Sequence, residues 1–199
     1  RQNGRSCFLA MCLTLLAGVP FAHGAITLYS DSFESYPVQN PAPNPLTNGP
    51  AGGEWFYVDA TPPLTTTNEH QIFSSGGLGA GLNSRVWASA TNGAQLTNAI
   101  SVSTLPPGPA PYTFRLSFVV AADTLTVARS ITFDYAIASS SGDLSFVSGR
   151  NLDDSQTFAG LSGTGIAKAG IIGKSNNRRF EFIFQSSAMT TADKITFNI

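Results

Sequence analysis

Two long stretches in the middle of the chain alternate between hydrophobic and polar residues. The hydrophobic residues occupy every second position in residues 112–120, and residues 131–137 repeat the pattern. Such alternation is typical of a β-strand with one buried face, because successive side chains point to opposite sides of a strand. A third stretch of this kind covers residues 179–185. We therefore expect these strands to meet in one core, which contains Phe114, Leu116, Phe118, Phe133, Tyr135, Phe180, Phe182 and Phe184.

Shorter stretches of strand-like composition flank these three. They cover residues 26–36, 55–58, 71–74, 84–90, 95–103, 143–148 and 194–199. Segments rich in proline, glycine and asparagine separate them, and prolines in such segments cannot donate to a strand ladder. We expect residues 160–173, which are rich in glycine, to form a meander. About ten to twelve short strands without a convincing amphipathic helix predict an all-β fold, an antiparallel β-sandwich of the jelly-roll type in one domain.

The first 24 residues have the layout of a signal peptide. Arg1 and Arg5 precede an apolar run over residues 7–19, and residues 22–24 supply the small side chains that a signal peptidase reads. The run is too short to be a membrane-spanning helix. We therefore expect cleavage after residue 24 and a mature domain of residues 25–199 without a membrane span, secreted or held at a bacterial cell surface. Both cysteines lie in the apolar run, so we expect no disulfide in the mature domain.

The composition argues against several classes of partner. Charged residues make up 12% of the chain, whereas about 25% is usual in soluble domains, and the formal net charge is -1. Nucleic-acid-binding proteins carry a basic patch that attracts phosphate, and the only basic cluster here is the Arg178-Arg179 pair. We therefore expect no nucleic-acid partner and a neutral surface rich in hydroxyl groups.

Three segments carry a resemblance to a known family. They are DSFESY near the start of the expected mature domain, the aromatic strand at residues 55–57, and the central strand YTFRLSFVV. In these the chain resembles the concanavalin A-like lectin/glucanase superfamily and, more narrowly, the laminin-G-like jelly rolls of exported bacterial proteins. Many of those proteins carry a C-terminal sorting tail of the PEP-CTERM type. Because the chain begins without methionine and ends within a strand, we expect it to be a fragment of such a protein.

The sequence lacks the catalytic motif of the glucanases in this superfamily. They use Glu-x-Asp-x-x-Glu on one strand, because alternate residues project into the same cleft as nucleophile and acid. The four glutamates are Glu34, Glu54, Glu69 and Glu181, and none has an aspartate two residues later. We interpret Glu181 as an outward residue of a sheet that pairs with Arg115 or Arg179. The chain also lacks a Gly-x-Ser-x-Gly elbow, a phosphate loop and a zinc-like His/Cys spacing, so we assign no catalytic residues.

Calcium is the one metal that the sequence leaves open. Carboxylates and loop carbonyls are the oxygen ligands that calcium prefers. In several sandwich-type carbohydrate-binding modules the first and last strands share a structural calcium ion, and SDSFES near the start with TADKITF near the end resembles that layout. The predicted ligands are Asp31, Glu34 and Asp193. The alternative is that these are solvated carboxylates in turns.

Aromatic side chains are the candidates for sugar binding. Pyranose faces stack on aromatic rings, and sugar hydroxyls bind amide and carboxylate groups. Trp55, Tyr57 and Trp87 could provide such rings, although packing in the core is the usual role of a tryptophan. We expect an exported, non-catalytic sandwich that binds a glycan or cell-surface polysaccharide, or mediates attachment to a surface or matrix. The alternatives are a glycoside hydrolase or polysaccharide lyase of the same fold and a purely structural extracellular component.

Overall fold

The chain folds into strands that lie in two stacked sheets. The computed structural model describes residues 5–7, 11–16, 26–33, 35–37, 44–47, 49–58, 70–73, 86–89, 95–105, 110–123, 131–168 and 177–199. Within these ranges every strand pair is antiparallel. None of the residues in them belongs to a helix long and apolar enough to cross a membrane.

The larger sheet, which we call sheet A, has nine strands. Its main path runs through β11 (Thr157–Phe158), β10 (Ser145–Asn151), β13 (Asn177–Ser186), β8 (Tyr112–Asp123), β1 (Arg5–Cys7), β6 (Val86–Ser89) and β5 (His70–Phe73). Of the other two strands, β2 (Met11–Leu16) pairs with the first half of β8, and β3 (Ile26–Asp31) pairs with the other side of β2. The longest pairing in the sheet joins β13 to β8 over residues 177–186 and 112–121.

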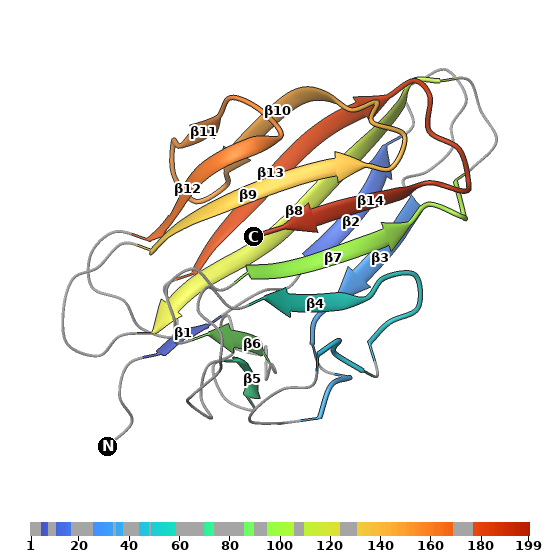
Figure 1. Ribbon diagram of the computed structural model, residues 1–199. Helices are drawn as coiled ribbons and strands as arrows, with labels where there is room; N and C mark the ends of the chain where they lie inside the picture. The colour runs from blue at the N-terminus through green and yellow to red at the C-terminus, as the bar shows by residue number, and fades with distance from the viewer. Residues whose placement is uncertain are drawn as a thin grey trace.

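The smaller sheet, sheet B, has five strands. Their order is β12 (Ser162–Lys168), β9 (Ile131–Ser139), β14 (Lys194–Asn198), β7 (Gln95–Ser101) and β4 (Trp55–Val58). In Figure 1, β9, β14, β7 and β4 form the near layer, and β13, β8, β2 and β3 form the layer behind it. The fold is therefore an all-β, antiparallel sandwich, as the alternation predicted.

The predicted core is confirmed. Phe114, Leu116, Phe118, Tyr135, Phe180, Phe182 and Phe184 are all at most 5% exposed, and Phe133 is partly buried against them. The ring of Phe118 on β8 lies 6.0 Å from that of Phe133 on β9 and 4.9 Å from that of Phe197 on β14, measured between ring centroids. The two sheets are thus joined by aromatic contacts from the strands whose alternation was most regular.

Most strand positions agree with the sequence, and β12 is the main difference. Residues 160–173 were expected to form a meander, but Ser162–Lys168 forms a strand that pairs with β9. The glycines in this strand serve packing. A Cβ atom at Gly165 would collide with the Phe133 ring, and one at Gly163 would lie 3.0 Å from the Tyr135 hydroxyl oxygen. Glycine here leaves room for aromatic rings of the neighbouring strand, which the composition alone does not reveal.

As a signal peptide, the N-terminal segment is expected to make few contacts with the sandwich, but parts of it form strands of sheet A in this structure. Met11–Leu16 forms β2, which pairs with β8 from Met11 opposite Phe118 to Leu16 opposite Thr113, and also pairs with β3. An apolar segment can adopt this place because β8 has backbone groups to pair on the edge that β13 leaves free. Residues 5–7 pair with β8 as well. Removal of residues 1–24 on export stays a prediction.

Candidate functional site

Two of the three predicted sugar-stacking residues, Trp55 and Tyr57, are buried. The Trp55 side chain is fully buried, and Tyr57 is only 7% exposed. Phe56, which lies between them on β4, is the exposed ring of this strand. Trp87 lies in β6 opposite Ile72, and its side chain falls outside the part of the chain that the structure describes. Neither Trp55 nor Tyr57 therefore presents a ring face that a sugar could reach in this structure.

Asp31 lies at the centre of a buried polar cluster. Its Oδ2 atom accepts hydrogen bonds from the Tyr29 hydroxyl at 2.9 Å, the Tyr36 hydroxyl at 2.8 Å and the Trp55 indole Nε1 at 2.8 Å. Its Oδ1 atom accepts the backbone N–H of Phe33 at 2.7 Å. Four donors thus surround a carboxylate that is 3% exposed. A buried carboxylate needs such partners because its transfer out of water is costly.

The Asp31 cluster also affects the backbone conformation of Phe33 and the pKa of Tyr29 and Tyr36. Phe33 has a positive φ of 62°, a conformation that is unusual for a residue with a side chain. The hydrogen bond from its N–H to Asp31 closes a side-chain turn that stabilises this conformation. Burial raises the pKa of Tyr29 and Tyr36, and the negative charge of Asp31 raises it further. Both hydroxyls therefore stay protonated as donors to Asp31.

Of the predicted calcium ligands, Asp31 does not fit a cation in this arrangement, because the four donors turn their hydrogens toward its oxygens. Asp193 accepts hydrogen bonds from Thr190 and from the Ser140 hydroxyl, which lower its pKa. Glu34 lies outside the described residues. The described ranges contain no group of three or more His, Cys, Asp or Glu side chains that could hold a metal ion. Calcium binding stays a prediction, which melting with and without EDTA would test.

A different set of polar residues gathers on the outer face of sheet A. We use this name for the outward side chains of β8, β10 and β13, opposite the aromatic core. They are Thr113, Arg115, Ser117, Val119, Ser145, Val147, Ser148, Arg150, Arg179, Glu181, Ile183 and Gln185. The strand register places Arg150, Glu181 and Ser117 in one row across the sheet and Ser148, Ile183 and Arg115 in the next.

An ion cluster occupies the middle of this face. Glu181 Oε1 accepts hydrogen bonds from Arg150 Nε at 3.1 Å and Nη2 at 2.8 Å, and Glu181 Oε2 lies 3.3 Å from Arg115 Nε. The Glu181 side chain is 10% exposed, whereas those of Arg115 and Arg150 are 38% and 59% exposed. Arg115 Nε is buried, and its contact with Glu181 lacks the alignment of a hydrogen bond. The carboxylate is thus recessed between two guanidinium groups that reach the surface.

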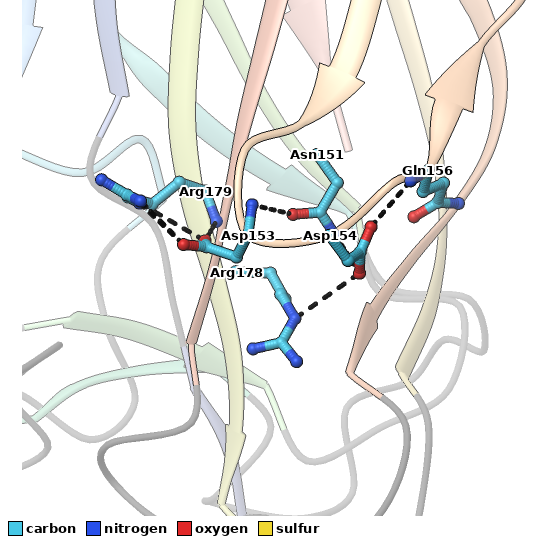
Figure 2. Close-up of polar contacts among 6 residues, drawn as sticks. All are labelled: Asn151, Asp153, Asp154, Gln156, Arg178 and Arg179. Carbon is cyan, nitrogen blue, oxygen red and sulfur yellow. Dashed lines mark hydrogen bonds and ion pairs between the residues drawn. The ribbon is translucent and has the colours of Figure 1, made fainter.

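The turn between β10 and β11 is fixed beside this face. Figure 2 shows Arg179 bound to Asp153, with Nη2 and Nε at 2.8 and 3.0 Å from Oδ1, and Arg178 near Asp154. Within the turn, Asn151 Oδ1 accepts the N–H of Asp153. Burial alone would raise the pKa of Asp153, but the hydrogen bonds and charge of Arg179 outweigh it and lower that pKa. These pairs hold the turn against the start of β13.

The sequence predicted part of this arrangement. Glu181 was expected to face outward and to pair with Arg115 or Arg179, and the structure places it beside Arg115, whereas Arg179 binds Asp153. The main partner, Arg150, was missed because the strand was expected to end at residue 148. Its place opposite Glu181 depends on a register shift between Phe146 and Ser148, which no pattern in the sequence marks.

A comparison with protein-family models, curated proteins and solved structures finds no match for this chain. The resemblance to concanavalin A-like proteins therefore rests on the three segments named above.

Proposed function

We propose that the chain is an exported, non-catalytic β-sandwich that binds carbohydrate, or attaches to a cell-surface or matrix polysaccharide, through the outer face of sheet A. In this proposal the sandwich is a concanavalin A-like jelly roll. The supporting observation is the polar middle of that face, where Arg115, Glu181 and Arg150 lie beside hydroxyl and amide side chains. Guanidinium, carboxylate, hydroxyl and amide groups are the partners that sugar hydroxyls bind.

A binding role is favoured over hydrolysis by the count of carboxylates. A glycosidase needs two carboxyl groups about 5 to 9 Å apart on the substrate-binding face. Among the side chains of β8, β10 and β13 that the structure describes, which do not include that of Asp123, Glu181 is the one carboxylate, and Asp153 in the neighbouring turn is bound to Arg179. Both of its oxygens already contact guanidinium groups. These contacts fix the positions of the guanidinium groups at the surface, and fixed polar groups are what the binding of a specific ligand requires.

A glycan array probed with the full chain tests the proposal, together with an assay for released reducing sugar on each glycan that binds. We expect binding without release. Ser148→Leu places a bulky apolar side chain on the outer face, next to Ile183 and Arg115, and should weaken binding about tenfold or more. Ala136→Leu is the matched control, because Ala136 is an exposed small residue on the other sheet. Equal binding by both variants would place the ligand elsewhere, and release of sugar would reveal an enzyme.

A further inference from the structure

The proposed binding face has an excess of positive charge at its centre. Two guanidinium groups, from Arg115 and Arg150, flank the single carboxylate of Glu181. The two ion pairs beside them carry no net charge, because Arg179 faces Asp153 and Arg178 faces Asp154. The chain as a whole has a net charge of -1. The excess is therefore a local property of this part of sheet A.

The two arginines keep donors for a ligand. Arg150 uses Nε and Nη2 for one oxygen of Glu181, and a guanidinium group has more N–H donors than these. Its side chain is more than half exposed. Arg115 Nε lies 3.3 Å from Glu181 Oε2, and that contact lacks the alignment of a hydrogen bond. Glu181 thus fixes the position of both side chains without using all of their donors.

The face offers no aromatic ring to a neutral sugar. The described outward side chains of β8, β10 and β13 are aliphatic, hydroxyl, amide or charged, and the rings of these strands point into the core. Neutral sugars depend on stacking against such rings. Carboxylate and sulfate groups instead match the planar fork of arginine, which binds them through paired hydrogen bonds.

We propose that the ligand of the outer face of sheet A is an acidic polysaccharide, whose carboxylate or sulfate groups are bound by Arg150 and Arg115 with Glu181 as the positioning residue. This inference rests on the proposed carbohydrate-binding function and specifies the class of glycan. A positive centre also attracts an acidic chain over a distance, so binding should weaken as salt is added.

Matched polymers test the charge of the ligand. The full chain is titrated with polygalacturonate and with its methyl-esterified form, and with dextran sulfate and unmodified dextran. We expect binding to at least one acidic polymer, with affinity for its neutral partner at least about tenfold weaker. The two acidic polymers tell carboxylate from sulfate recognition. Single-stranded DNA serves as a polyanion without sugar acids, and binding to it of equal strength would overturn the inference.

Substitutions test whether the two arginines and Glu181 have the proposed roles in binding the acidic polymer. Arg150→Gln and Arg115→Gln should each weaken binding to the acidic polymer about tenfold to a hundredfold, because each removes charge-assisted hydrogen bonds. Lys194→Gln is the control, because it removes the same charge from an exposed position on sheet B. Glu181→Gln should keep the ability to bind but alter the relative affinity for carboxylate and sulfate polymers, since the arginines lose their fixed positions. Melting curves confirm that each variant is folded, and Arg150→Gln alone decides the question if Arg115→Gln does not fold.

The outcomes separate the two proposals. Equal binding of neutral and acidic polymers, or no effect of Arg150→Gln, would overturn the acidic ligand and leave carbohydrate binding in place. Failure to bind any glycan on the array would overturn both.

Discussion

At the scale of single residues, Asp31 is the group whose loss should be most costly. Asp31→Ala would remove the acceptor that two buried tyrosine hydroxyls and the buried Trp55 indole N–H share. Each such donor costs about 1–3 kcal/mol, so we expect the free energy of unfolding to fall by about 3–5 kcal/mol in urea denaturation. Asp134→Asn is the control, because Asp134 is exposed and accepts one hydrogen bond from Thr164. A similar small loss in both variants would contradict the role of Asp31.

Asp153 should make the stability of the fold depend on pH. Its pKa is lowered in the folded state, chiefly by Arg179 acting against burial, so its carboxylate stabilises the fold at pH values above its unfolded pKa of 3.8. That contribution is lost as the pH falls below 3.8 through the folded pKa. Asp153→Asn should therefore lower the melting temperature at pH 7 and have a smaller effect near pH 2. Thermal melts at the two pH values measure this, and an equal effect at both would contradict the ion pair.

At the scale of elements, β13 holds the two sheets together. The Phe182 ring is fully buried and lies within 6.0 Å of the ring centroids of Phe118, Tyr135 and Phe158. Phe182→Ala should lower the free energy of unfolding by about 3–5 kcal/mol, because the neighbours can only partly fill the cavity. Phe56→Ala, on an exposed face of β4, should cost less than about 1 kcal/mol. Chemical denaturation of the two variants would measure the difference, and comparable losses would contradict the core assignment.

Some strands and buried residues could be predicted from the sequence, and others could not. Strand-like composition located β4 at residues 55–58. Alternation located the start of β9, ending two residues before the strand does, and identified the buried rings of β8 and β13, because burial of one face leaves a period of two in the sequence. It could not reveal β12, where glycine is required by neighbouring rings, or the bulge that aligns Arg150 with Glu181. The sequence also left Trp55 with two possible roles, sugar stacking and core packing, and in the structure its indole is buried and donates a hydrogen bond to Asp31. Such features depend on which strands become neighbours, and that information is not local.

At the scale of the whole molecule, the place of β2 in sheet A bears on which residues form the exported protein. In the structure, β2 lies between β8 and β3, with Leu13 opposite both Leu116 and Tyr29. The proposed export would remove this strand with the rest of residues 1–24. The 199-residue chain should then have β2 in sheet A, and the exported domain should lack it. A substitution in β2 should therefore change the stability of the first and not that of the second.

Leu13→Pro removes a backbone donor from β2, which is paired on both sides, so it should destabilise the 199-residue chain. A loss of about 1 kcal/mol corresponds to roughly 2–4 °C in melting temperature for a chain of this size. The secreted protein, which we expect to begin at residue 25, should melt at the same temperature whether or not its gene encodes the substitution. Mass spectrometry gives its first residue, and calorimetry gives both melting temperatures. A secreted protein that retains Met11–Leu16 would contradict cleavage, whereas an unchanged melting temperature of the 199-residue variant would contradict the place of β2 in sheet A.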